Sequence, residues 1–284
     1  MSPSGALWVR WDCDPTAHAV GHILCTARLH TICGLWLNPG SGACTISKIG
    51  QLRVGTSGYS YKEWKGNFYP KKMPDREMLS FYAKEFSTVE INYTFYHMPM
   101  ESALTNWTTQ VPQGFRFALK ANQQITHIRR LRDCESTLKR FLEVASVLQD
   151  GDHLGPILVQ LPPNFKFDKP LLEEFLALRP AAFAFAFEVR HASWYTEETY
   201  EVLRKHNTAL CLAESEKQTP PEVITADFTY VRLRLEDYTA EQLATWRKRF
   251  DMWVEQGVDV YVYCKHEDEG KAPEYARELL GAEK

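Results

Sequence analysis

The chain has 284 residues, the size of one large domain or two small ones. Hydrophobic residues make up 44% and charged residues 24% of it, and the formal net charge of -3 gives no overall basic field for nucleic acid. No apolar run reaches the roughly 18 residues of a membrane span, and the N-terminus lacks the pattern of a secretory signal. These properties argue against an integral membrane protein and against a protein that binds long nucleic acids.

Residues 1–50 differ from the rest of the chain, because they carry few charges and show little periodicity of either kind. We predict a poorly ordered N-terminal extension, and its simplest origin is translation from upstream of the native start. The alternative is a metal-binding or docking extension, which no cysteine spacing supports.

The seven cysteines are an odd number, and none of their spacings is a CxxC zinc pattern. Cys211 and Cys264 fall in predicted strands, where buried thiols act as small hydrophobic groups. We therefore predict a cytoplasmic protein in a reducing compartment, without structural disulfides and without a bound metal or other cofactor.

From Leu52 onward, apolar runs rich in β-forming residues alternate with amphipathic segments. The runs predict eight strands, at 52–57, 88–95, 116–121, 156–161, 183–189, 208–213, 228–234 and 259–265. The amphipathic segments predict helices near 75–86, 101–110, 135–149, 169–178, 196–206, 239–256 and 272–280. The connection 214–227 contains Thr219-Pro220-Pro221 and is expected to form at most a brief helical turn.

Strands that alternate with helices indicate an α/β protein with a parallel sheet. Residues 51–284 match the typical length of a TIM-type (β/α)8 barrel, which is about 250 residues. An open doubly wound sheet is the competing architecture, and it usually carries a glycine-rich phosphate loop after the first strand. The segment Gly55-Thr56-Ser57-Gly58 has neither the dinucleotide-binding spacing nor a P-loop lysine, so the barrel is favoured.

Several motifs, in chain order, resemble those of the YecE-like proteins, also called the domain of unknown function 72. They are Gly-Thr-Ser-Gly-Tyr at 55–59, Trp-Lys-Gly-Asn-Phe-Tyr-Pro at 64–70, Phe-Ser-Thr-Val-Glu-Ile-Asn at 86–92, Thr-Phe-Tyr at 94–96, Ile-Thr-His at 125–127, Gln-Leu-Pro-Pro at 160–163 and Glu-Val-Arg-His-Ala-Ser-Trp at 188–194. The resemblance covers about residues 52–280 and implies a TIM-type barrel, but it brings no established activity. The chain departs from the family pattern at Leu233-Arg234, where many members carry His-Gly, and at 264–268, where many carry Asn-Asn-Asp.

Side chains of barrel strands alternate between the lumen and the helix layer, and charged groups are expected to face the lumen. This alternation points Glu90, Asn92 and Thr94 inward. On the other strands it points inward Arg116, Ala118, Lys120, Leu158, Gln160, Ala186, Glu188, Arg190, Tyr230, Arg232 and Arg234. On the last strand, either Lys265 or His266 is expected to face inward.

Active sites of barrel enzymes lie at the C-terminal ends of the strands, where these polar side chains gather. We predict Glu90, Lys120 and Glu188 as catalytic residues: a carboxylate as general acid or base, and the lysine as stabiliser of negative charge or as a Schiff-base nucleophile. The predicted substrate-binding residues are Asn92, Tyr59, Trp64, His127, Gln160, Arg190, His191 and Arg232. Because cations outnumber carboxylates here, the expected substrate is a small molecule that bears phosphate or carboxylate.

Three alternatives remain open for this cluster. The charged groups could form a polar plug of mutual ion pairs that closes the barrel. A metal-dependent phosphoesterase or isomerase could draw ligands from Glu90, Glu188, His191, Glu214, His266 and Asp268, although no HxH or HxxE spacing fixes a site. The aromatic residues after the first strand could stack on a nucleotide or nucleic acid in a non-catalytic binding module, although such aromatics more often pack into the core of a lid. The oligomeric state is not predicted.

Overall fold

The computed structural model describes residues 48–281 except 217–218 and 266–269. Its strands are β1 (Leu52–Thr56), β2 (Thr88–Ile91), β3 (Arg116–Lys120), β4 (Leu154–Gln160), β5 (Phe185–Glu188), β6 (Ala209–Glu214), β7 (Phe228–Leu233) and β8 (Asp259–Cys264). Its α-helices are α1 (Met78–Glu85), α2 (Tyr93–Tyr96), α3 (Glu101–Thr108), α4 (Glu135–Asp150), α5 (Lys169–Ala177), α6 (Glu197–Lys205), α7 (Ala240–Glu255) and α8 (Lys271–Leu280). The N-terminal extension predicted over 1–50 lies almost entirely outside the described residues.

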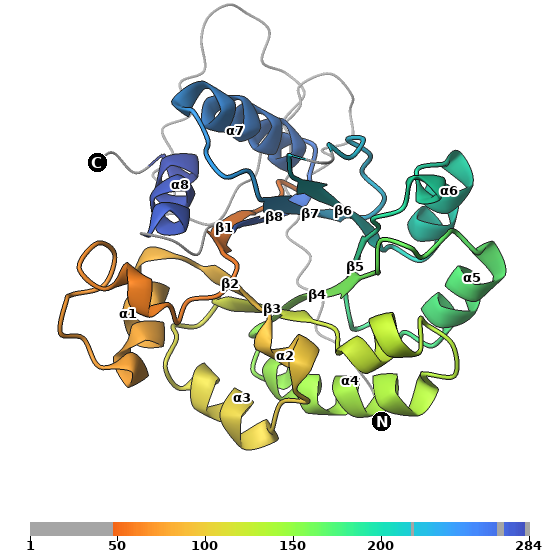
Figure 1. The fold of residues 1–284 in the computed structure, drawn as a ribbon, viewed down its shortest axis with the longest axis horizontal. Coiled ribbons are helices and arrows are strands. Elements are labelled where there is room, and N and C mark those ends of the chain that lie inside the picture. The colour runs from red at the N-terminus through yellow and green to blue at the C-terminus, as the bar shows by residue number, and fades with distance from the viewer. Residues whose placement is uncertain (1–47, 217–218, 266–269, 282–284) are drawn as a thin grey trace, which may run out of the picture. The chain divides into compact units, whose positions relative to one another are not determined.

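The eight strands form one parallel sheet in the order β1-β8-β7-β6-β5-β4-β3-β2, and the helices surround it (Figure 1). The first strand pairs with the last along its whole length, from Leu52 opposite Val260 to Thr56 opposite Cys264. The two end strands of this order, β1 and β2, meet at a single bridge between Ser57 and Glu90. The prediction of a TIM-type barrel is therefore confirmed, with one seam that lacks a continuous ladder.

The seam between β1 and β2 is held by a side chain of α1. The Tyr82 hydroxyl accepts a hydrogen bond from the backbone N–H of Thr56 (2.8 Å) and donates one to the carbonyl of Thr88 (3.0 Å). Gly55 has no room for a side chain here, because a Cβ atom would lie 2.0 Å from that same carbonyl oxygen. A glycine and a buried tyrosine thus replace the direct backbone pairing of the other seams.

Helix boundaries follow local capping chemistry. The Asp168 side chain accepts from the backbone N–H of Leu171 at the start of α5, and the Thr196 hydroxyl accepts from the backbone N–H of Thr199 at the start of α6. Helix α7 begins with a full capping box: the Thr239 hydroxyl accepts from the backbone N–H of Gln242, and Oε1 of Gln242 accepts from the backbone N–H of Thr239.

Buried apolar residues form two separate clusters, as expected for a barrel. The larger cluster lies between the strands and the helices. The smaller one fills the lumen and consists of Ala118, Leu158, Ala186, Ala209, Cys211, Phe228, Tyr230 and Tyr263. Their alternation along each strand agrees with the predicted inward positions. The last strand ends at Cys264 and His266 lies outside the described residues, so the expectation that either Lys265 or His266 faces inward stays a prediction.

The prediction that the second strand continues to residue 95 is wrong. The strand ends at Ile91, because the backbone of Asn92 turns into the α-helical region (φ -85°, ψ -19°) and α2 follows. The Thr94 hydroxyl lies within hydrogen-bonding distance of two backbone carbonyl oxygens that can accept its proton, that of Ile91 in the same turn (3.2 Å) and that of Lys120 on β3 (2.6 Å). Thr94 therefore fastens the backbone of β2 to that of β3 instead of facing the lumen.

Candidate functional site

The upper lumen is organised around Arg232 on β7, whose side chain is almost fully buried. Its Nη2 atom lies 2.8 Å from Oε1 of Glu90 on β2, and its Nη1 atom lies 2.5 Å from Oε2 of Glu188 on β5. Arg234, at the end of β7, adds a longer contact of 3.4 Å to Oε1 of Glu188. One arginine thus joins strands from opposite sides of the barrel.

Both carboxylates accept further hydrogen bonds from neighbouring side chains. Glu90 accepts hydrogen bonds from the hydroxyls of Ser57 (2.5 Å) and Tyr230 (2.8 Å). Glu188 accepts one from Nε2 of Gln160 at 2.8 Å. Both carboxylates are therefore paired and hydrogen-bonded, as buried charges must be.

Asn92 extends this network toward the surface, because its Nδ2 atom donates to Ser57 Oγ at 2.8 Å and to Glu90 Oε1 at 3.3 Å. The sequence predicted Asn92 as a lumen residue of a continuing strand. The structure brings it to the cluster from the first turn after β2 instead.

The electrostatics of the cluster hold both acids ionised. Burial favours the neutral form of Glu188, but the attraction of Arg232 and Arg234 and the hydrogen bonds outweigh it and lower the pKa to about 2. Glu90 shows the same balance between burial and Arg232, and its pKa is also lowered. Carboxylates in this state are weak proton acceptors at neutral pH.

Lys120 ends β3 beside this cluster and is only partly buried. Its Nζ atom lies 4.1 Å from the ring centroid of Phe95, and no carboxylate oxygen of the described residues lies within 4.0 Å of it. Burial and then the repulsion of Arg232 lower the pKa of Lys120 to about 8. The amine therefore has a substantial neutral fraction near physiological pH.

His127 lies close to this lysine, in a π-helical turn at Gln124–Ile128. Its Nδ1 atom is 2.8 Å from the Thr126 hydroxyl, and its ring packs edge-on against Phe95 with centroids 4.9 Å apart. Burial, followed by the positive charges of Lys120 and Arg190, lowers the pKa of His127. A π-helical turn is uncommon and frequently marks a functional position.

Arg190 lies two residues beyond the end of β5, so its side chain is exposed rather than inside the barrel. Among the described residues it has no hydrogen bond or ion pair. Its positive charge nevertheless contributes, after burial, to lowering the pKa values of His127 and Arg234. The group thus consists of two carboxylates, Glu90 and Glu188, against four cations, Lys120, Arg190, Arg232 and Arg234. Among the described residues of this group, the cations outnumber the carboxylates.

The structure does not bring all predicted residues to this cluster. Trp64 is completely buried and packs against Tyr61, Phe68 and Tyr69, so it has no surface for a substrate in this arrangement. His191 begins the 3₁₀ turn Ala192–Trp194, and its Nδ1 accepts the backbone N–H of Ser193 at 3.1 Å. Both residues have evident roles in shaping the loops.

Tyr59 is partly buried and lines a hollow of about 410 Å³ beside the ends of β1 and β2. The lining residues that give this hollow its aromatic character are Tyr59, Tyr61, Tyr93 and Trp107. Asn92 also lines it, so the hollow shares one wall with the charged cluster.

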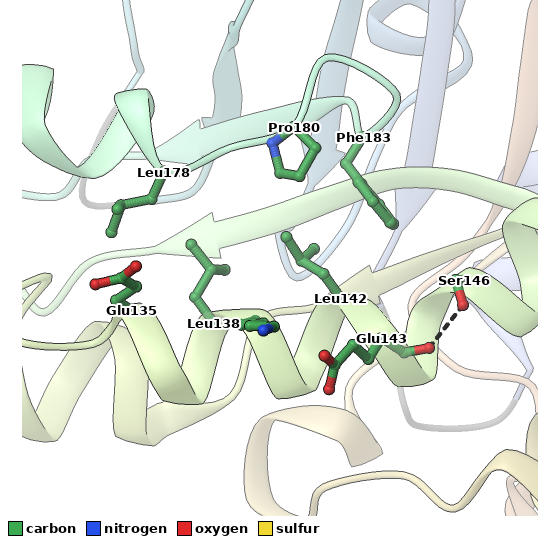
Figure 2. A pocket seen from close by; sticks show the side chains of 9 residues that line it. Glu135, Leu138, Leu142, Glu143, Ser146, Leu178, Pro180 and Phe183 are labelled. Atoms are coloured by element: carbon green, nitrogen blue, oxygen red, sulfur yellow. Dashed lines mark hydrogen bonds between the residues drawn. The ribbon is translucent and has the colours of Figure 1, made fainter.

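Another hollow lies far from this chemistry, between α4 and the connection from α5 to β5 (Figure 2). Leu138 and Leu142 of α4 face Pro180 and Phe183 across it, and its volume is about 480 Å³. It contains no residue of the charged cluster. Its apolar floor and position in the helix layer give no support for acid–base chemistry.

The residues considered as metal ligands do not converge on one point in the described structure. Glu90 and Glu188 are occupied by Arg232, whereas Glu214 turns into the helix layer and accepts from Tyr238 (2.9 Å) and from Trp246 Nε1 (3.0 Å). No group of three or more His, Cys, Asp or Glu residues in the described part of the chain is arranged to hold a metal ion. His266 and Asp268 lie outside the described residues.

Sequence reasoning missed Ser57, Tyr230 and Arg234 as members of the site. Tyr230 and Arg234 were expected to face the lumen, and their contacts with the two carboxylates follow from that alternation. Ser57 follows the last residue of β1, and its contact with Glu90 depends on how the barrel closes between β1 and β2. Only the closure of the sheet could reveal that contact.

Comparisons with known proteins agree with the fold. The model of the family described as protein of unknown function DUF72 matches residues 53–283. The UPF0759 protein YecE of Escherichia coli is 27% identical over 227 residues, which cover 70% of this chain and 82% of that protein. The UPF0759 protein YunF of Bacillus subtilis is 23% identical over 269 residues, which cover 81% of this chain and 93% of that protein. The crystal structure of a DUF72 family protein from Thermotoga maritima superimposes with a TM-score of 0.72 at 26% identity, covering 81% of this chain and 98% of that one.

Proposed function

Since this chain belongs to the DUF72 family, whose description names no activity, we propose a function from the barrel mouth itself: an enzyme that acts on a small anionic substrate by acid–base chemistry. The substrate bears a phosphate or a carboxylate and binds at the C-terminal ends of the strands, where barrel enzymes place their active sites.

The excess of cations over carboxylates among the described residues of the charged cluster is the observation that supports this proposal. Arg232 forms ion pairs with both buried carboxylates, and Lys120 and Arg190 have no carboxylate partner among the described residues. Cations held close together repel one another. A bound anion offsets that repulsion, and arginine can hold phosphate or carboxylate through two parallel hydrogen bonds.

The proposed roles follow from exposure and charge state. Arg190 and Arg234 bind the anionic group of the substrate, and Lys120 and His127 exchange protons with its reacting atoms. The sequence favoured Glu90 or Glu188 as the general acid or base. Because both are paired with Arg232, accept further hydrogen bonds and have lowered pKa values, we propose instead that they position Arg232.

Anion binding can be measured by thermal unfolding in the presence of inorganic phosphate, sulfate and a panel of phosphorylated and carboxylated metabolites. A ligand at about 100 times its Kd stabilises the folded protein by about 2.7 kcal/mol. We expect Arg190→Ala with Arg234→Ala to abolish the stabilisation. Arg76→Ala is the matched control, because it also removes an arginine, but one whose side chain is 84% exposed and lies outside the charged cluster. This variant should keep the stabilisation. If no anion stabilises the protein, or if the double variant responds like the wild type, the proposal is wrong.

A second candidate is a non-catalytic module that binds a nucleotide or short nucleic acid. It is supported by exposed aromatic side chains on α2 near the mouth, since Tyr93 is 58% and Tyr96 is 63% exposed. Salt-dependent binding of oligonucleotides that is lost in Tyr93→Ala with Tyr96→Ala, without turnover of any small anion, would favour this module.

The setting is proposed to be the reducing cytoplasm. Cys134, Cys211 and Cys264 are buried free thiols, which suits that compartment. No helix in the described part of the chain has the length and apolar character needed to cross a membrane.

A further inference from the structure

We infer that Lys120 is a nucleophile that forms an imine with a ketone or aldehyde carbon of the substrate. This inference rests on the proposed function and makes it more specific, because it adds a carbonyl group to the phosphate- or carboxylate-bearing substrate. The anion is then the handle by which the mouth holds the molecule, and the carbonyl is the group that reacts.

The surroundings of Lys120 differ from those of an ordinary structural lysine. Lys169, for comparison, lies 3.1 Å from a carboxylate oxygen of Glu198, and that partner raises its pKa. The Nζ atom of Lys120 rests on the face of Phe95 instead, and the nearby acids are already bound to Arg232. A partly buried amine beside another cation is the environment that activates lysine nucleophiles.

The lysine is also rigidly placed. Its backbone pairs with Leu158 of β4, and its carbonyl oxygen accepts the Thr94 hydroxyl from the other side at 2.6 Å. The ring of Phe95 supports the end of the side chain. A substrate whose anionic group is held by Arg190 and Arg234 would present its carbonyl to a fixed amine, which lowers the entropic barrier to addition.

The covalent step balances without any additional reagent. The lone pair of the neutral Nζ atom attacks the carbonyl carbon, and the carbonyl electrons move to oxygen to give a carbinolamine. That oxygen gains two protons in all and leaves as water, while the nitrogen lone pair forms the C=N bond. Overall, the lysine ammonium and the carbonyl compound give a protonated imine and one water, and nothing is oxidised or reduced. His127 is the adjacent titratable group that can carry the protons.

The reaction should show a distinctive pH dependence. Burial, Arg232 and Arg234 disfavour the charged form of Lys120, whereas the charges of Glu90 and Glu188 favour it, and the resulting pKa of Lys120 is about 8. Imine formation should therefore rise with a midpoint near pH 8. An ordinary surface lysine would become reactive only near pH 10.4.

The experiment is reductive trapping on the full-length protein. The wild type, Lys120→Arg and Lys169→Arg are incubated with pyruvate or dihydroxyacetone phosphate and then treated with sodium borohydride, which reduces an imine to a stable amine. Peptide mass spectrometry locates the adduct. We expect the adduct on Lys120 in the wild type and in Lys169→Arg, and its loss in Lys120→Arg, which keeps the positive charge but cannot form the imine.

Anion binding by the same samples separates the two proposals. If anions stabilise the protein but no adduct appears at Lys120, or if labelling is spread equally over the exposed lysines, the imine is refuted and the anion site stands. If no anion binds, the proposed function fails and the imine fails with it. A trapped adduct that decreases in Arg190→Ala with Arg234→Ala would support both.

Discussion

Replacing Arg232 by methionine tests whether the charged cluster is built as described. The substitution leaves Glu90 and Glu188 buried without their common cation. A carboxyl pKa lowered from 4.5 to about 2 corresponds to about 3 kcal/mol of interaction that favours the ionised form of Glu188 in the folded protein, at about 1.36 kcal/mol per pKa unit. Removing one partner of a buried pair typically costs about 3–5 kcal/mol. We expect Arg232→Met to lose about 3–5 kcal/mol of unfolding free energy at pH 7.

The loss should depend on pH in a defined direction. In the wild type, the stabilisation from Glu188 is fully present above pH 4.5 and is lost as the pH falls through about 2. In the variant, burial without the arginine raises the pKa of both carboxyls, so acidification allows them to be buried neutral. The difference in stability between the two proteins should therefore shrink as the pH falls from 7 toward 5.

Urea denaturation at several pH values measures this difference. Arg132→Met is the matched control, because its pair with Asp168 is exposed and should contribute only about 0–1 kcal/mol. Adding Glu90→Gln and Glu188→Gln to Arg232→Met should recover part of the lost stability, since no buried carboxylate then remains without its arginine. If the loss is the same at pH 7 and pH 5, or if the glutamines recover nothing, it comes from packing, and the electrostatic reasoning is refuted.

Three further predictions can be checked by the same denaturation measurements. Tyr82→Phe should cost about 1–3 kcal/mol, because it leaves the Thr56 N–H and the Thr88 carbonyl at the β1–β2 seam without their hydrogen bonds; wild-type stability would show that the hydroxyl does not hold the seam. Thr239→Ala should cost about 1 kcal/mol by removing the cap of α7, and Thr239→Ser should restore most of it. Lys120→Met should stabilise the protein by about 1–3 kcal/mol at pH 7, because burial and Arg232 disfavour the ammonium in the folded state. That gain should vanish as the pH rises from 8 to 10.5, and a Lys120→Met protein less stable than the wild type at pH 7 would contradict the lowered pKa.

The architecture could be predicted because each of its signals is local. Apolar runs, capping residues such as Asp168 and the spacing between elements are all visible along the chain. Alternation within strands also predicted that Glu188, Gln160 and Arg232 share the lumen, and their contacts bear out that placement. A period of two residues is enough to assign a side of the sheet once one charged position is fixed.

The rest depended on features that are not local. The segment after Ile91 consists of Asn-Tyr-Thr-Phe-Tyr, which is rich in strand-forming residues, and the sequence predicted a continuing strand. It becomes helical where Thr94 can bond both Ile91 and Lys120, and this bond requires β3 to be in place. The pairing of Arg232 with both acids likewise depends on distances across the lumen. Only after this pairing is known do Lys120 and Arg190 stand out as the cations left over.

The closure between β1 and β2 is the one joint of the described barrel without a ladder of backbone hydrogen bonds. Elsewhere around its circumference, adjacent strands share ladders of backbone hydrogen bonds, whereas this joint relies on Tyr82 below and on the bridge at Ser57 above. The charged cluster spans the same joint, since Glu90 is bound by Ser57, which directly follows β1, and by Arg232 of β7. Glu90 therefore belongs both to the charged cluster and to the closure of the barrel. We expect a ligand that moves Arg232 or Asn92 to change the stability of the contact between β1 and β2 as well.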